Sequence, residues 1–475
     1  MADVYISGVG MTRFGKHEGS LHDMIGEAVK KATEECGIDD FDAIYVGVMS
    51  PEEFLGQGNI AASIVDYLGF SGTPSFRIET ASSTGAAVFQ AAFYAVASGY
   101  IKRALVLAGE KMTHLPTPTT TGILAEVIEQ KERSAGATMP ALAAMITQKY
   151  MSTYEIPLST MEQYLSKVAL KNHYNGSLNK FAQFQEAISE ETYFKSRIIA
   201  APLRLYDCSP ISDGAVALIL TSDKTDIKVS GIGHGTDTLG VRFRNSFTTF
   251  KSTQIAAKKA YQMAKLNPHD IDIAELHDAF TPFEIIDMED VGFYPPGKGV
   301  YAIENGETNI GGKLPVNTSG GLKSRGHPVG ASGLAQIIDL AWQLRGQVNE
   351  KRLTQNASVG LAQSIGGLAN NNFVTIIERS DRNRVIAPNW QPTFNPEIAL
   401  KAPHQKDPES ITPMGTVETF TVLYIAPKEF ETPFQIGFVR DDNGHVLIAK
   451  SKEVKDLKVG DRVNLSQEDG KVFIE

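Results

Sequence analysis

The sequence feature that most limits how this chain can fold is a weak internal repeat between its first and second halves. Three short motifs occur twice in the same order, at offsets of 223, 228 and 230 residues. Preserved order with small insertions favours two copies of one folding unit, so a duplicated architecture is predicted. The motif pairs are Ser7–Gly10 and Ser230–Gly233, Ala28–Ala32 and Ala256–Ala260, and Asp40–Asp42 and Asp270–Asp272.

The first half alternates strand-like and helix-like segments. Apolar runs predict strands at Tyr5–Val9, Ala43–Val48 and Ala104–Ala108. Apolar residues recur at helical spacing over Leu21–Cys36, and a second helix, rich in small apolar residues, is predicted to end at Ala97. Strands and helices that alternate in this way are typical of a parallel sheet covered by helices, so the predicted fold class is α/β.

Changes in pattern along the chain mark the predicted domain boundaries. Six prolines between positions 388 and 413 predict a linker. Beyond it, a turn at Asp441–Gly444 between two strand-like runs and a further strand over Lys458–Val463 predict a small all-β unit, most naturally a five-stranded barrel. The predicted units are a first half with an insertion, a second half, a linker and a β unit: 1–226 with the insertion at about 113–194, 227–385, 386–413 and 414–475.

Charge and composition disfavour several classes of protein. The 45 basic and 55 acidic residues give a net charge of −10, which disfavours nucleic acid as the main partner. The sequence has no run of about 18 apolar residues, so no membrane span is expected. Cys36 and Cys208 are the only cysteines, too few for a disulfide framework or a four-cysteine zinc site. With no signal-peptide pattern in the first ten residues, a reducing cytoplasm is the expected location.

Four segments place polar residues or glycines where strands and helices are predicted to meet. Taken singly, each has a structural explanation: Ser82 or Ser83 as a helix cap, His277 as a satisfied polar residue, and a glycine-rich loop as a tight turn. Together and in this order they indicate an active site. The segments are Glu79–Gly85, Glu275–Phe280, Asn317–Gly330 and Ser364–Gly367.

These segments, with Cys208–Ala215, resemble the thiolase superfamily, and within it the sterol-carrier-protein-type and archaeal thiolases. The resemblance covers about residues 3–380. It implies a five-layer αβαβα fold of two similar halves, an active site where they meet, and coenzyme A thioesters as substrates, with no metal and no tightly bound cofactor. The β unit resembles the small OB-fold partner proteins of such thiolases, here fused to the chain. A homodimer or homotetramer is expected by the same resemblance.

The resemblance also implies that both thiols of the thiolase mechanism are missing. Ser82 stands where thiolases carry the nucleophilic cysteine, and Ser364 and Ala279 stand at the two places where the second cysteine occurs. A hydroxyl is far less acidic than a thiol and needs an adjacent general base. His327 is the expected base, because the matching family histidine stands beside the nucleophile.

The residues that bind the thioester look intact by the same comparison. His277 and His327 match the histidines that stabilise negative charge on thioester oxygens, and the backbone near Gly366 is expected to add N–H donors. Asn317 and Ser319 are the expected substrate-binding residues.

The first functional hypothesis is therefore an acyl-CoA enzyme that makes or breaks a carbon–carbon bond next to the thioester, by acyl transfer of the acetyl-CoA acetyltransferase kind. Two alternatives stay open. One is retro-aldol cleavage of a 3-hydroxyacyl-CoA, with Tyr294 or Ser364 as acid/base, although a tyrosine beside two prolines is more often a packed loop residue. The other is a non-catalytic acyl-CoA-binding scaffold. Nucleic-acid binding by the β unit is disfavoured, because no aromatic pair lies in a basic stripe.

Overall fold

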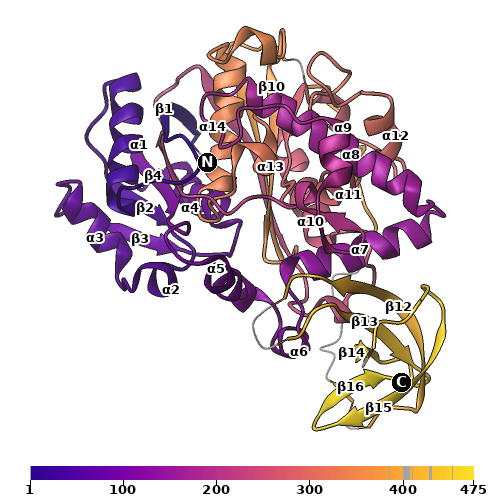
Figure 1. Ribbon diagram of the computed structural model, residues 1–475. Coiled ribbons are helices and arrows are strands. Elements are labelled where there is room, and N and C mark those ends of the chain that lie inside the picture. Colours follow the sequence, from indigo (N-terminus) through magenta and orange to yellow (C-terminus); the bar gives the residue numbers. More distant parts are fainter. Residues whose placement is uncertain (1, 385, 399–406, 409, 427–429, 452) are drawn as a thin grey trace.

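The computed structural model describes residues 2–384, 386–398, 407–408, 410–426, 430–451 and 453–475 (Figure 1). Two α/β halves form the body of the molecule, and a small β-barrel packs against helix α7 (Met139–Thr153). Within the described ranges, none of the helices is both long and apolar enough to cross a membrane.

The first half supplies five strands of a nine-stranded sheet, in the order β3-β2-β4-β7-β1. Strand β2 is parallel to β3 and β4, whereas β7 runs antiparallel to β4 and β1. The sheet is therefore mixed and not purely parallel as predicted, because the chain returns from the insertion along β7 in the opposite direction. The elements are β1 (Tyr5–Met11), α1 (Leu21–Cys36), β2 (Ala43–Gly47), α2 (Pro51–Leu55), α3 (Ile60–Tyr67), β3 (Ser75–Ile78), α4 (Thr84–Ala97), β4 (Arg103–Glu110) and β7 (Gly214–Thr221).

The second half repeats this topology in the order β8-β11-β10-β9, and β8 pairs with β1 to join the halves. Strand β10 is parallel to β9, and β11 is antiparallel to β10 and β8. A parallel bridge between Ala274 and Val316 lies where β3 pairs with β2 in the first half. The predicted duplication is thus confirmed. The elements are β8 (Ile227–Thr236), α10 (Lys251–Ala264), β9 (Ile273–Glu275), α11 (Thr281–Asp290), α12 (Gly299–Glu304), α13 (Gly321–Arg325), α14 (Ser332–Arg345), β10 (Val359–Gly366) and β11 (Asn371–Arg379).

The chain between β4 and β7 is mainly helical and covers the second half. Its longest helix packs against α11, α12 and α13, so it lies beneath the segments that carry the predicted site. The elements are α5 (Thr117–Leu124), α6 (Gln130–Ser134), α7, α8 (Leu158–Ser177), α9 (Glu190–Lys195), β5 (Ile198–Ala200) and β6 (Leu203–Arg204).

The repeated glycines have a packing reason. A methyl group on Gly10 would overlap the carbonyl oxygen of Ala28, and one on Gly233 would overlap the carbonyl oxygen of Ala256. Strands β1 and β8 therefore need glycine where they lie against the backbones of α1 and α10. The repeat records two equivalent strand–helix contacts.

Helices α4 and α14 form the middle of five layers. Helices α1 and α3 cover the outer face of the first half-sheet, α10 and α11 that of the second, and α4 and α14 fill the space between. The two central helices touch near their N-terminal ends: a Cβ on Gly85 would lie 2.6 Å from the amide nitrogen of Leu334, and one on Gly333 would lie 2.8 Å from that of Ala86. This contact brings together the loops that precede the two helices.

The C-terminal strands close into a five-stranded barrel in the order β12-β13-β14-β16-β15, with β12 pairing on both sides. The predicted hairpin is confirmed, because Gly444 donates its amide to the carbonyl oxygen of Asp441. The strand predicted over Lys458–Val463 begins only at Arg462, since the preceding residues form a turn. Part of the predicted linker, residues 399–406 and 409, lies outside the described residues. The strands are β12 (Met414–Leu423), β13 (Phe434–Asp441), β14 (Val446–Ser451), β15 (Arg462–Glu468) and β16 (Lys471–Ile474).

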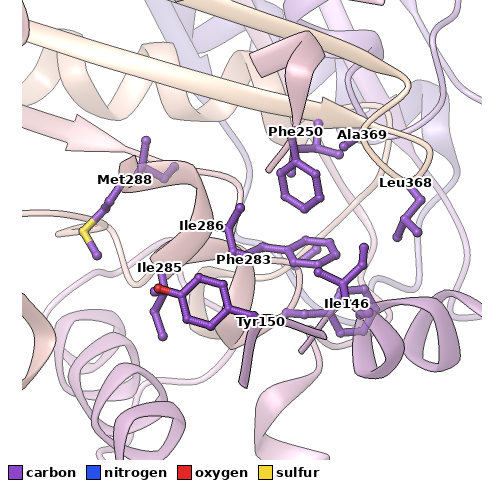
Figure 2. Packing of buried hydrophobic residues seen from close by; sticks show 14 of the residues in the cluster. Ile146, Tyr150, Phe250, Phe283, Ile285, Ile286, Met288, Leu368 and Ala369 are labelled. Atoms are coloured by element: carbon purple, nitrogen blue, oxygen red, sulfur yellow. The ribbon is translucent and has the colours of Figure 1, made fainter. Parts of the chain in front are cut away.

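The barrel shares the core of the second half. Its strand β12 pairs with β5 through Leu423 and Ala200, and Phe438 stacks on Phe247 with ring centroids 5.5 Å apart. Figure 2 shows a deeper part of this core, where Phe250 stands edge-on to Phe283 of α11. The barrel is thus packed against the elements that support the predicted site.

Candidate active site

His277 and His327 come together at the junction of the two central helices. His277 follows β9, and His327 precedes α14. Their ring centroids lie 5.2 Å apart with the planes at 89°, and the residues are 2% and 8% exposed. Two imidazoles that lie this close together and are this well shielded from solvent can act on the same small group of a ligand.

Hydrogen bonds fix both the position and the tautomer of His327. Its backbone amide donates to Ser212 Oγ at 2.9 Å, and its Nδ1 lies 2.7 Å from Ser332 Oγ. The Ser332 hydroxyl donates its proton to the carbonyl oxygen of Pro328, so it accepts from His327. Nδ1 therefore carries the proton, and Nε2 of His327 is left with a free lone pair.

Burial keeps both imidazoles neutral. Burial and, to a smaller extent, the nearby Arg325 guanidinium lower the pKa of His327 to about 3. The pKa of His277 is well below its usual value for the same reason, with contributions from His327 and Arg325. At neutral pH the pair can accept a proton or donate an N–H without first losing a charge.

Buried polar side chains fix the backbone at His277. Its backbone amide donates to Gln363 Oε1 at 3.0 Å, and Gln363 Nε2 donates to Asp287 Oδ1 at 3.0 Å. The next residue, Asp278, accepts from Asn172 Nδ2 of α8 at 2.6 Å. By contrast, His277 Nδ1 is buried and has no hydrogen-bond partner among the described residues. This nitrogen, without a partner in the described part of the chain, is therefore left for a bound water.

Ser82 lies at the start of the other central helix. The N-cap position of α4 is Ser83, whose hydroxyl donates to the carbonyl oxygen of Thr80 at 2.8 Å, so the structure does not use Ser82 as a helix cap. Ser82 is partly exposed and follows Ala81, which has a φ of 54°. A left-handed non-glycine residue is uncommon and costs energy, and such strain is often found at functional sites.

Gly366 and Ser364 reach this junction from β10. A methyl group on Gly366 would overlap the carbonyl oxygen of Thr80 and the hydroxyl of Ser83, so the end of β10 lies directly against the Ser82 loop. Ser364 lies deeper, beside Gly333 of α14. Its hydroxyl is buried and has no hydrogen-bond partner among the described residues.

The structure gives Asn317 and Ser319 partners inside the protein. Asn317 accepts from the Leu276 amide at 2.7 Å and donates to Glu284 at 2.7 Å, while Ser319 donates to Glu275 at 2.5 Å. Both side chains are fully buried, with 0% exposure. The predicted substrate contact does not fit this geometry, in which both residues support the segment that carries His277.

Tyr294 is placed by contacts of a different kind. Its hydroxyl donates to Glu307 at 3.0 Å, and its ring faces the ammonium of Lys313 at 6.0 Å. Burial and the Glu307 carboxylate raise its pKa. These contacts suit a packed loop residue and commit its hydroxyl to Glu307.

Several residues that shape the site carry no signal that sequence reasoning detected. Ser332 stands five residues after His327, at the start of a helix where serine is unremarkable. Gln363 lies 86 residues from its partner His277, and Asn172 lies 106 residues from Asp278 on an inserted helix. Pairs so distant are visible only once the chain has folded. In the described ranges, no group of three or more histidine, cysteine or acidic side chains is arranged to hold a metal.

Two protein-family profiles match the chain. One is described as "Thiolase, N-terminal domain" and matches residues 4–224. The other is described as "Thiolase C-terminal domain-like" and matches residues 233–379. Their border falls between the two topological repeats.

Two relatives cover most of the two halves. An acetyl-CoA acetyltransferase from Methanothermobacter thermautotrophicus is 40% identical over 390 residues, which are 80% of this chain and 100% of that protein. Human sterol carrier protein 2 is 31% identical over 392 residues, covering 76% of this chain and 70% of that protein.

Solved structures extend the likeness in fold. A monomeric SCP2-thiolase like protein type 1 from Mycobacterium smegmatis superposes with a TM-score of 0.75 and 16% identity, over 100% of both chains. The Ltp2-ChsH2(DUF35) aldolase has a TM-score of 0.68 and 23% identity, covering 80% of this chain and 99% of that chain.

Proposed function

This chain belongs to the thiolase superfamily, and from that premise we propose that it is an enzyme that makes or breaks a carbon–carbon bond next to a coenzyme A thioester. The observation that carries the proposal is the pair of neutral imidazoles, His277 and His327, with ring centroids 5.2 Å apart at the junction of α4 and α14. The relative named acetyl-CoA acetyltransferase, matched over its whole length, supports the thioester as substrate.

The two histidines have different roles in this proposal. His327 presents its Nε2 lone pair, because Ser332 holds the proton on Nδ1. It therefore acts as the general base, and as a donor only after it has taken a proton. His277 has an unpartnered ring nitrogen and, directly or through a water, stabilises the negative charge on the thioester oxygen of an enolate.

In acyl transfer, His327 removes the Ser82 proton and the Ser82 oxygen attacks the acyl carbonyl carbon, which displaces either coenzyme A or the carbon fragment. In this proposal, Ser82 is the residue at the thiolase nucleophile position, and Ser364 and Ala279 are those at the positions of the second thiol, on the resemblance of Glu79–Gly85 and the other motifs. The backbone N–H groups at the start of α4 favour negative charge there. The acyl-oxygen ester is a poorer acyl donor to a thiol than a thioester is, so turnover by this route is expected to be slow.

Serine and alanine at these positions also favour a second candidate, retro-aldol cleavage of a 3-hydroxyacyl-CoA. His327 Nε2 takes the β-hydroxyl proton, and the Cα–Cβ bond breaks to release an aldehyde or ketone. The bond electrons form the thioester enolate beside His277, and the His327 imidazolium returns the proton to its carbon. No covalent intermediate is needed, so this reaction does not require a thiol at these positions. His327 replaces Tyr294 as the base, because the Tyr294 hydroxyl is bound to Glu307.

The test is product analysis by mass spectrometry after incubation with 3-oxoacyl-CoA plus free coenzyme A, and separately with 3-hydroxyacyl-CoA. Acyl transfer predicts a shorter acyl-CoA that requires free coenzyme A, with an acyl adduct on Ser82 that is absent from Ser82→Ala. Aldol cleavage predicts a carbonyl product without added coenzyme A, retained in Ser82→Ala and lost in His327→Gln. Tyr294→Phe should keep either activity, and its loss would return Tyr294 to the mechanism.

A non-catalytic scaffold is the remaining outcome. Thioester binding measured by calorimetry, with no product from any 3-oxo or 3-hydroxy substrate tested, would overturn the enzymatic proposal. His277→Ala separates the cases further, since a scaffold would lose binding whereas the proposed enzyme would lose turnover.

A further inference from the structure

Glu275 and Arg325 form one buried ion pair. Glu275 lies two residues before His277, and Arg325 lies two residues before His327. Glu275 is the last residue of β9, and Arg325 is the last residue of α13. Both side chains are 0% exposed, with Arg325 Nη1 3.6 Å from Glu275 Oε2. Ser319 joins them, because its hydroxyl accepts from Arg325 Nη1 at 3.2 Å and donates to Glu275 Oε2 at 2.5 Å.

We propose that Glu275 and Arg325 are positioning residues: their contact holds the segments that carry His277 and His327 at a fixed spacing. We call this pair of residues the clamp. The proposal deepens the proposed function, on which it rests, since it assigns the geometry of the imidazole pair to a specific contact.

The residues between the clamp and the histidines transmit its position. Leu276 separates Glu275 from His277, and its amide is bound to Asn317 Oδ1 at 2.7 Å. Gly326 separates Arg325 from His327 and has a φ of 113°. A Cβ at Gly326 would lie 2.9 Å from Ser212 Oγ, the group that also holds the His327 amide. Each histidine is thus one constrained residue away from the ion pair.

Stability alone is a weak reason for such a pair. Burying two charges costs solvation, and an apolar pair of similar size is often at least as stable. Arg325 is among the largest fully buried side chains, and its Nε and Nη2 have no hydrogen-bond partner in the described part of the chain. A guanidinium kept under these conditions is better explained by its directional contact with Ser319 and Glu275.

The positive charge of Arg325 also acts on the two histidines. The guanidinium contributes to the low pKa of both His277 and His327, after the larger effect of burial. The clamp therefore helps to keep both rings in the neutral form that the site uses.

The test compares Arg325→Lys, Glu275→Gln and the double variant Glu275→Gln/Arg325→Met in the full-length protein. Arg325→Lys keeps the charge but replaces the planar guanidinium, whose Nη1 contacts both Ser319 and Glu275, with a shorter ammonium group. The double variant leaves no unpaired buried charge. The first two should lower kcat roughly tenfold or more with KM unchanged, because an error of about 1 Å in a catalytic group can cost about a hundredfold.

Imidazole ¹H–¹⁵N spectra at pH 7 give a readout that needs no turnover. In the wild type, His327 should show a single Nδ1–H tautomer, whereas both single variants should show shifted or mixed signals. The matched control is Glu132→Gln/Arg242→Met, which removes another buried ion pair, with Arg242 Nη1 3.1 Å from Glu132 Oε1. It should lower the melting temperature but leave the imidazole spectra unchanged.

The pair would be only structural if the clamp variants lost thermal stability like the control but kept wild-type kcat and wild-type imidazole spectra. That result would leave the proposed function standing, because His327→Gln tests it separately. Conversely, a protein without thioester turnover would still report on the clamp through its spectra.

Discussion

Nδ1 of His327 lies 2.7 Å from the hydroxyl oxygen of Ser332, and this hydroxyl donates a hydrogen bond to the carbonyl oxygen of Pro328. These two hydrogen bonds decide which ring nitrogen of His327 carries the proton. Ser332→Ala removes the acceptor, so Nε2 carries the lone pair in only a fraction of the molecules. We expect kcat to fall by about tenfold or more, with little change in KM, because the base is then partly in the wrong tautomer.

The matched control for Ser332→Ala is Ser166→Ala on α8. Ser166 is also buried and donates to a carbonyl oxygen one turn earlier, that of Gln163, at 2.8 Å. The two variants should lose similar thermal stability. Equal kcat values for both variants would contradict the orienting role of Ser332.

The contact between α4 and α14 predicts that Gly85→Ala is harmful although alanine favours helices. Its Cβ would lie 2.6 Å from the amide nitrogen of Leu334 and 2.9 Å from the carbonyl oxygen of Gly330, and neither backbone atom can rotate away. Overpacking of this kind costs about 1–3 kcal/mol, which exceeds the gain of about 1 kcal/mol in helix propensity. Separation of the helices should also reduce kcat, because Ser82 and His327 precede them.

Gly122→Ala on α5 is the control for that substitution. No atom lies within 4 Å of a Cβ at Gly122, so the helix should gain up to about 1 kcal/mol. Melting temperatures measured by scanning fluorimetry should therefore move in opposite directions for the two variants. A shift of the same sign in both would argue against close contact of the central helices.

The duplicated fold could be predicted because its repeats have local causes. Gly10 and Gly233 are needed where a strand meets a helix backbone, and each such need is visible within one repeat. The mixed direction of the sheet could not be predicted in the same way. It depends on where the chain re-enters after the insertion, which is settled by packing between distant segments.

The candidate site could likewise be predicted only in part. Ser82, His277 and His327 stand at strand–helix junctions in recognisable motifs, and the structure brings their loops together. Whether a motif residue faces the ligand or the interior is a different question. Asn317 and Ser319 belong to one of these motifs, yet both point into the protein because Leu276, Glu284 and Glu275 bind them there. Such orientation depends on partners that are distant in sequence.

The shared core predicts that the barrel unfolds together with the body. Phe438 of β13 is fully buried against Phe247, so Phe438→Ala should cost about 3–5 kcal/mol. Calorimetry should show one main transition, shifted to lower temperature. Val463→Ala, in the barrel's own apolar cluster, should shift the same transition. Two transitions, of which only one responds to these variants, would show that the barrel is an independent unit.

Asp290, at the end of α11, predicts how stability changes with pH. Burial, with a smaller contribution from the Glu289 carboxylate, raises the pKa of Asp290 from about 4 to about 8. The hydrogen bonds that Thr249, the Phe250 amide and Gln254 donate only partly oppose this rise. The folded state therefore binds this proton more tightly than the unfolded chain does. Its contribution to stability is present below pH 4 and is lost as the pH rises toward 8, by at most about 1.4 kcal/mol per pH unit. Asp290→Asn removes this dependence, so its melting temperature relative to the wild type should increase from pH 5 to pH 8.

Asp442→Asn is the control for this prediction, because Arg462 lowers the pKa of the exposed Asp442 and confines its titration to more acidic pH. An Asp290→Asn protein whose melting temperature runs parallel to the wild type across this range would mean that Asp290 is already ionised in the folded protein at pH 5.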